Sequence, residues 1–160
     1  MKIKYFGFFL IASLCTSSAF ANDSDAEGCR NVNTMAGRLV ILDINMQADG
    51  LYNEVKLNGA SFDKLYGFAG SCDKHTLNNG LVDRMLVYDF NNGGSNPPTI
   101  SLYDFRATPP VALQIGSEFL VGGIKWPKDR GVLLKLDGGK YKGRWYEFDD
   151  EKLIPIPVQK

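Results

Sequence analysis

The chain has 160 residues, with 18 basic and 18 acidic side chains and a single histidine. The length suits one domain, and the balanced charge argues against a general binder of nucleic acid or other polyanions. A single histidine also leaves few candidates for a catalytic base, which argues against most serine and cysteine hydrolases.

The N-terminus has the three-part layout of a bacterial secretory signal peptide. Lys2 and Lys4 precede an apolar run at residues 5–15, and an Ala-Phe-Ala sequence follows at residues 19–21. The apolar run is shorter than the roughly twenty residues that a membrane-spanning helix needs. We therefore predict that residues 1–21 are cleaved, and that the mature protein is periplasmic or secreted and has no stable membrane anchor.

Two cysteines, Cys29 and Cys72, remain after removal of the signal peptide. Two thiols in an oxidising compartment most simply form one disulfide, and the chain lacks the C-x-x-C spacing of redox and metal sites. We therefore predict a structural disulfide between them. It tethers a polar N-terminal segment, residues 22–36, to a single β domain at residues 37–160.

Apolar residues alternate with polar ones over much of the mature chain, which is the period of a β-strand. They fall on one side of the segment 40–46, turn residues follow at 47–50, and apolar residues return over 51–57. This pattern predicts a hairpin. Leu39 and Ile41 lie on the opposite side of its first strand, which we therefore expect to be covered on both faces.

A second hairpin is predicted near the C-terminus. Val132, Leu134 and Leu136 share one side of a strand, and the turn sequence Asp-Gly-Gly follows at residues 137–139. If two residues of this turn form the loop, three residues of the second strand lie on the same side as Val132, Leu134 and Leu136. These residues are Tyr141, Gly143 and Trp145. The basic residues of this hairpin then form an outward, solvated face.

The other predicted elements are shorter. A helix is predicted only around residues 60–68, where Ser61 could cap it and Gly67 would end it. The remaining strand candidates are residues 85–90, 99–105, 119–121, 124–126 and 153–158. Together with the hairpins they predict an all-β fold, a single-domain antiparallel β-sandwich or β-barrel of roughly eight strands with at most one short helix.

Residues 141–147 resemble the Gly-x-Trp-Tyr-Glu strand that opens lipocalins, in which a tryptophan closes the bottom of a ligand-holding barrel. In that family the strand stands near the mature N-terminus, whereas here only a short segment follows Trp145. The resemblance implies a barrel with a cavity and carries no ligand-binding residue over to this chain.

The sequence contains no arrangement of side chains that requires catalysis or metal binding. His75 lacks a partner nucleophile and is expected to lie in an exposed loop. Carboxylates such as Glu118 and Glu147 are available for glycoside hydrolysis, but nothing fixes a pair at a working separation. Residues 89–93 offer oxygen ligands without the closing acid of a calcium loop, and a polar turn is expected there. We predict no catalytic residue, no metal and no cofactor.

The leading interpretation is an exported, non-enzymatic binding protein. Its candidate roles are those of an inhibitor or an immunity-type protein. It would bind a protein partner in the bacterial envelope through loops on a β scaffold, and no nucleic acid. The predicted loops combine prolines, which limit the entropy lost on binding, with one aromatic side chain. The candidate partner-binding residues are Asn92, Ser95, Pro97, Pro109, Trp126, Lys128 and Arg130.

Two alternative functions are compatible with the same composition. One is a periplasmic carrier that holds a small apolar ligand in a barrel cavity. The other is a secreted hydrolase that uses carboxylates such as Glu118 and Glu147.

Overall fold

A computed structural model describes residues 28–42, 45–47, 50–90, 97–129, 131–149 and 151–157. The predicted signal peptide, residues 1–21, lies outside this range. The described part of the chain contains no helix with the length and apolar character required to cross a bilayer. Apart from a short helical segment at residues 28–30 it is built from strands, so the all-β prediction is confirmed.

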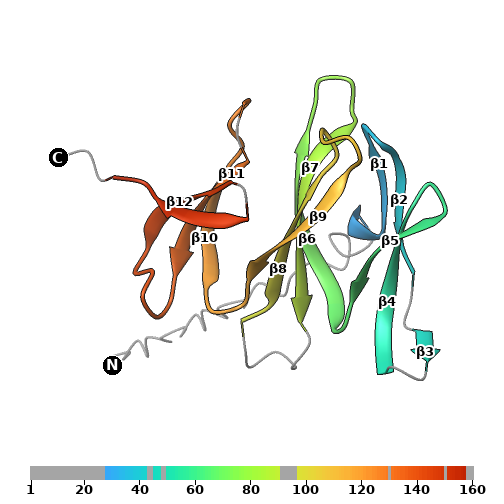
Figure 1. Cartoon of the computed structure of the whole chain (residues 1–160), viewed down its shortest axis with the longest axis horizontal. Helices are drawn as coiled ribbons and strands as arrows, with labels where there is room; N and C mark the ends of the chain where they lie inside the picture. The colour runs from blue at the N-terminus through green and yellow to red at the C-terminus, as the bar shows by residue number, and fades with distance from the viewer. Residues whose placement is uncertain are drawn as a thin grey trace, which may run out of the picture.

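The described strands form two sheets (Figure 1). The larger sheet has nine strands: β1 (Asn31–Thr34), β2 (Gly37–Ile41), β3 (Asn45–Gln47), β4 (Gly50–Leu57), β5 (Ala60–Leu65), β6 (Phe68–Thr76), β7 (Val82–Phe90), β8 (Thr99–Asp104) and β9 (Val111–Gly116). The smaller sheet has four: β10 (Leu120–Lys125), β11 (Val132–Asp137), β12 (Arg144–Asp149) and β13 (Lys152–Pro155).

The larger sheet runs in the order β3-β4-β2-β1-β7-β8-β9, with β5 paired to β4 and β6 paired to β7. The smaller sheet runs in chain order, β10-β11-β12-β13. The described strand pairs are antiparallel except for β1 and β7, which meet in parallel where Thr34 lies beside Val82. Short connections join most consecutive strands, as is usual for antiparallel sheets.

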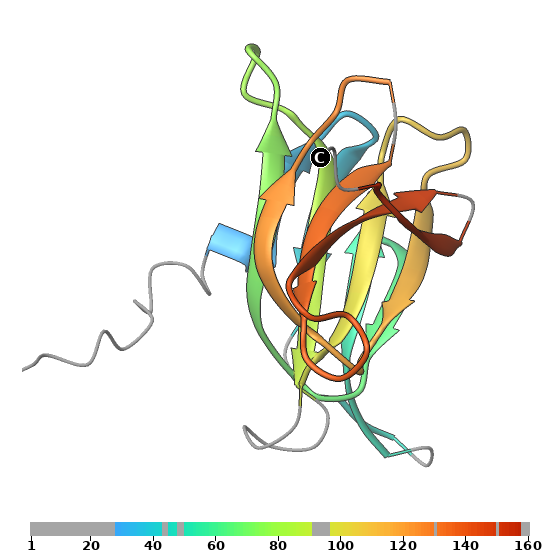
Figure 2. The ribbon, with the colours of Figure 1, turned by 90° about the vertical axis from the view of Figure 1, so that its left-hand side faces the viewer.

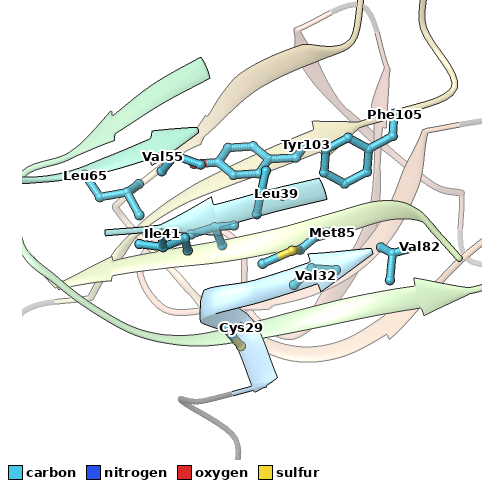
Figure 3. Close-up of a cluster of buried hydrophobic side chains, with 11 residues drawn as sticks. Cys29, Val32, Leu39, Ile41, Val55, Leu65, Val82, Met85, Tyr103 and Phe105 are labelled. Atoms are coloured by element: carbon cyan, nitrogen blue, oxygen red, sulfur yellow. The ribbon is translucent and has the colours of Figure 1, made fainter. Parts of the chain in front are cut away.

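The larger sheet curls towards itself into a barrel-like shape, and side chains fill its interior (Figure 3). Phe62 of β5 packs edge-to-face on Tyr103 of β8, with ring centroids 5.2 Å apart. The Tyr103 hydroxyl also donates a hydrogen bond of 2.8 Å to the carboxylate of Asp63. These contacts bring the first half of the sheet against the second and nearly close the barrel.

A second core lies between the two sheets. Successive side chains of a strand point to opposite faces, so β7 directs Met85 and Val87 into the barrel and Leu86 towards the smaller sheet. This strand is therefore buried on both faces. The residues of the second core are Leu86, Ile100, Leu102, Phe119, Val132, Leu134, Leu136, Tyr141 and Phe148.

The predicted disulfide is confirmed. The sulfur atoms of Cys29 and Cys72 are 2.01 Å apart, and Cys29 is only 4% exposed among the side chains of the barrel interior. The bond joins the start of the described chain to β6. Strand β1, which lies within the polar N-terminal segment, pairs with β2 in an antiparallel hairpin.

The first predicted hairpin is present as β2 and β3 against β4. Leu39 and Ile41 are buried and Val40 and Leu42 are half-buried, so the first strand is covered on both faces as predicted. Part of the predicted turn, residues 48–49, lies outside the described residues.

The predicted helix at residues 60–68 is wrong. This segment contains β5, which pairs with β4 through a two-residue turn at Asn58 and Gly59. Both turn residues have positive φ, 53° and 81°, which matches the twist of the two strands. The Asn58 side chain also accepts a hydrogen bond from the backbone of Arg38 and donates one to the carbonyl of Ala36. The Asn-Gly turn therefore outweighs the weak helical pattern.

The C-terminal hairpin exists with a different register from the predicted one. Leu134 pairs with Tyr146, and the connection spans residues 138–143 instead of two residues. The longer loop folds back and buries Tyr141, whose ring packs edge-to-face on Phe119 at 5.0 Å. Trp145 consequently lies beside Lys135, on the face of the smaller sheet that is turned away from the second core.

Candidate binding surface

Three loops lie together at one end of the molecule, the upper end in Figure 1. They connect β6 to β7 (residues 77–81), β8 to β9 (105–110) and β10 to β11 (126–131). Hydrogen bonds tie them to neighbouring segments: Phe105 N–H donates to the Asp83 carbonyl at 2.9 Å, and the Arg106 side chain donates to the Lys128 carbonyl at 3.3 Å. We call this region the loop end.

The space between the two sheets becomes charged where it reaches the loop end. Towards the loop end, the next residue on the face of Leu86 in β7 is Arg84, and the next residue on the face of Leu102 in β8 is Asp104. Arg84 and Asp104 lie opposite each other in the strand register. The apolar second core therefore ends in a layer of polar side chains beneath the loops.

Arg84 holds both ends of the 126–131 loop. Its side chain is 1% exposed, and Nη1 donates hydrogen bonds of 2.7 Å to the carbonyls of both Pro127 and Gly131. Its Nε lies 3.5 Å from the Asp83 carboxylate, and its guanidinium carbon lies 5.4 Å from the centre of the Trp126 ring. Burial lowers the pKa of Arg84, while the nearby Asp83 carboxylate favours its charged form.

His75 belongs to the same cluster, so the expectation that it lies in an exposed loop is wrong. It lies in β6, is half-buried, and its Nδ1 is 2.6 Å from the carboxylate of Asp83. An ionised Asp83 carboxylate only accepts hydrogen bonds, so Nδ1 is the donor in this contact when it carries the imidazole proton. The imidazole ring also packs near the Trp126 ring, with centroids 5.9 Å apart. His75 thereby orients Asp83 beside Arg84.

Arg106 provides a second support for the loop. Its Nε donates to the Asp104 carboxylate at 2.9 Å, and its backbone N–H donates to the same oxygen at 2.9 Å. Burial by itself raises the pKa of Asp104, but the hydrogen bonds and positive charge of Arg106 outweigh it, so the pKa lies below its ordinary value. Asp104 therefore stabilises the fold as a carboxylate.

Replacing Asp104 with asparagine is expected to lower the free energy of unfolding by about 1–2 kcal/mol near pH 6, because a charge-assisted pair is lost. Because the pKa of Asp104 is lower in the folded state, its carboxylate stabilises the fold fully at pH values above its unfolded pKa of about 3.9. This stabilisation is lost as the pH falls through the pKa of the folded state. The difference from the parent protein should therefore shrink below about pH 4. Urea titrations of the variant and the parent protein between pH 3 and pH 7 measure this difference in the free energy of unfolding.

The matched control for this prediction is Glu118→Gln. The Glu118 side chain is 78% exposed and faces Lys140 at 4.0 Å, so its loss should change stability by less than about 0.5 kcal/mol. A difference between Asp104→Asn and the parent protein that stays constant down to pH 3 would contradict the assigned role of Asp104.

The structure brings together some of the candidate binding residues and separates others. Pro109 and Lys128 are exposed at the loop end, and Trp126 is half-buried there against the second core. Pro97 is exposed at the opposite end of β8, about 20 Å away for a strand of this length. Asn92, Ser95 and Arg130 lie outside the described residues.

Sequence reasoning missed the two cations that support these loops, one buried and one half-buried. Arg84 and Arg106 flank the predicted strands at 85–90 and 99–105, and charged residues at strand ends usually face solvent. Met35 was also missed: it is 50% exposed in the turn between β1 and β2, and its N–H donates to the Val82 carbonyl at the start of β7. The pairing of β1 with β7 places it at the loop end, which the sequence alone does not reveal.

A cleft of about 540 Å³ opens beside the loop end, between the two sheets. Gly131 forms part of its wall, and a Cβ atom there would overlap the carbonyl oxygen of Phe148. Only glycine therefore allows the loop to return this close to β12. The cleft is lined by Leu102, Asp104, Arg106, Val111, Leu113, Asp129, Gly131, Phe148, Asp149 and Glu151.

The other chemical possibilities raised by the sequence gain no geometric support. Glu118 follows β9 beside the 138–143 loop, whereas Glu147 lies in the middle of β12 opposite Leu133. Among the described residues, no group of three or more histidine, cysteine or acidic side chains is placed to hold a metal ion. The Asp89 carboxylate accepts hydrogen bonds from two backbone N–H groups in the β5–β6 connection, while residues 91–93 lie outside the described residues.

No protein-family model matches the chain, and neither a curated protein nor a solved structure shows significant similarity to it. The short resemblance to lipocalins also fails structurally. Trp145 lies on the outer face of a four-stranded sheet, where Lys125 Nζ is 4.6 Å from the centre of its ring, and it does not close the bottom of a barrel.

Proposed function

We propose that this protein is an exported, non-enzymatic binding protein that holds a protein partner of the bacterial envelope at its loop end, as inhibitors and immunity proteins do. The observation that carries the proposal is the support of the 126–131 loop by Arg84 through both Pro127 and Gly131, while Lys128 and Asp129 remain exposed. A loop fixed before binding loses little conformational entropy when the partner docks.

The chemistry of the loop end supports contact with another protein. Among its described residues, one large apolar side chain, that of Met35, is exposed beside polar ones, and methionine is enriched in protein interfaces. Lys128 and Asp129 supply charges of opposite sign, which favour a defined orientation over general attraction. Among the described residues of the three loops, the exposed polar side chains are Asn78, Asn79, Thr108, Lys128 and Asp129.

Two further observations bear on this proposal: one argues against the carrier alternative, and the other is compatible with export. The interior of the barrel-like sheet is filled by side chains such as Met85, Tyr103 and Phe105, each no more than 3% exposed, so nothing there supports a carrier of an apolar ligand. The disulfide between Cys29 and Cys72 is compatible with an oxidising compartment, as the predicted export requires.

The test is affinity capture from envelope extract and culture supernatant, with the disulfide-intact mature chain as bait. We expect one protein to be retained, and Lys128→Glu to weaken its binding by about tenfold or more, because the variant reverses a charge within the contact surface. The retained protein is identified by mass spectrometry, purified and titrated by calorimetry. Trp126 is not a suitable probe, because its replacement would disturb the contacts with Arg84 and His75.

Lys140→Glu is the matched control, because it makes the same charge reversal on an exposed side chain of the 138–143 loop. This loop lies at the end of the molecule opposite the loop end (Figure 2). Equal losses for the two variants, or retention by both, would place the partner elsewhere and contradict the proposal. The carrier function would replace it if no protein were retained and native mass spectrometry of the bait showed a bound small molecule.

A further inference from the structure

The cleft beside the loop end has an apolar floor built from both sheets. Leu102 and Leu113 come from β8 and β9, and Phe148 comes from β12. Half-buried Val111 also lines the cleft. A volume of about 540 Å³ is within the range of sites that hold small ligands, so a long side chain of a docked protein can enter.

The mouth of the cleft is acidic. Asp129, Asp149 and Glu151 line it and are exposed, and none of them forms an ion pair among the described residues. Arg106 is the one cation in the described lining, and its guanidinium is bound to Asp104. The described lining therefore carries an excess of negative charge beside its apolar residues.

We propose that this cleft binds a lysine or arginine side chain of the partner protein, an inference that rests on the proposed function. Such a side chain has an apolar stem that can lie on Leu102, Leu113 and Phe148, and a cation that can reach the carboxylates at the mouth. A neutral aliphatic side chain would use only the floor, and an acidic side chain would be repelled. Asp129 and Gly131 belong to both the cleft and the 126–131 loop, so a partner on the loop end can reach it.

The experiment titrates the full mature chain with short, blocked glycine peptides that carry one central lysine, arginine or norleucine, and follows the methyl resonances of Val111 and Leu113 by NMR. Norleucine is the matched probe, because it keeps the apolar stem and lacks the cation. We expect saturable shifts for the basic peptides, with half-saturation at about tenfold lower concentration than for norleucine, as charge-assisted hydrogen bonds would give. The methyl groups of Leu136, at the opposite end of β11, should not shift.

The double variant Asp149→Asn with Glu151→Gln is expected to remove the advantage of the basic peptides. Asp137→Asn, an exposed carboxylate at the far end of β11, is its control and should leave the titration unchanged. Equal affinity for the lysine and norleucine peptides, shifts that do not saturate, or an advantage that persists in the double variant would each overturn the inference.

The outcome is separable from that of the proposed function. If the basic peptides fail to bind while Lys128→Glu still releases the captured protein, the cleft assignment is wrong and the loop end remains the contact surface. If the peptides bind while no captured protein depends on Lys128, the proposed function is wrong and the cleft remains a site for cationic side chains.

Discussion

Arg84→Met is expected to lower the free energy of unfolding by about 3–5 kcal/mol, the usual cost of removing one partner from a buried charged cluster. Methionine can replace the stem but donates no hydrogen bond, so the carbonyls of Pro127 and Gly131 lose the donor that they share. The Asp83 carboxylate also loses the cation at its side. Urea unfolding of the disulfide-intact chain measures this difference.

Arg144→Met is the matched control, because Arg144 is exposed on β12 and the same atoms are removed. It should change the stability by less than about 0.5 kcal/mol. Arg84→Lys provides an intermediate case, since it keeps the charge but lacks the rigid guanidinium that places Nη1 at both carbonyls while Nε lies beside Asp83. A loss below about 1 kcal/mol for Arg84→Met, or equal losses at positions 84 and 144, would show that Arg84 does not hold the loop.

The same substitution connects stability with binding. Once the loop is no longer held at Pro127 and Gly131, the amides of Lys128 and Asp129 are expected to exchange with solvent faster than those of β11. Binding of the partner would then require the loop to be ordered at the moment of contact. Affinity should therefore fall in Arg84→Met even though every exposed side chain of the loop is unchanged.

The central strands of the fold could be predicted because their own residues determine them. Apolar residues alternate or run continuously in β7, β8 and β11. An alternating pattern matches a strand that is buried on one face, and a continuous pattern matches a strand that is buried on both. Strand β6 was not predicted, because its sequence around Cys72 and His75 is mostly polar and its pairing with β7 decides its conformation. Strand β5 differs from the predicted helix because the hairpin turn at Asn58 and Gly59 pairs it with β4.

The candidate site was predictable only in part, because a binding surface depends on which loops the strands bring together. The composition of their loops predicts Pro109 and Lys128 as contact residues, and the strand order places both at the loop end. The same composition predicts Pro97, but this residue lies at the opposite end of β8. The importance of Arg84 depends on two carbonyls more than forty positions further along the chain, and no local pattern indicates such contacts.

Loss of the disulfide is the other change with a large expected effect. Replacing Cys29 and Cys72 with alanine should lower the free energy of unfolding by about 2–4 kcal/mol, in line with a crosslink that closes a loop of this length. The native state also loses support, because β1 meets β7 only where Thr34 lies beside Val82. Without the disulfide, β1 is joined to the rest of the sheet mainly through its hairpin partner β2.

Urea titrations of the oxidised chain, the reduced chain and the double alanine variant measure this effect. The reduced chain and the variant should be destabilised to a similar extent, and reductant should have no effect on the variant, which has no crosslink to lose. Amide exchange near Val32 should accelerate more than exchange near Lys128, because the disulfide adjoins the strand that contains Val32, whereas Arg84 holds the 126–131 loop. If the oxidised chain and the variant agreed within about 0.5 kcal/mol, the β1–β2 hairpin would be held by its packing alone.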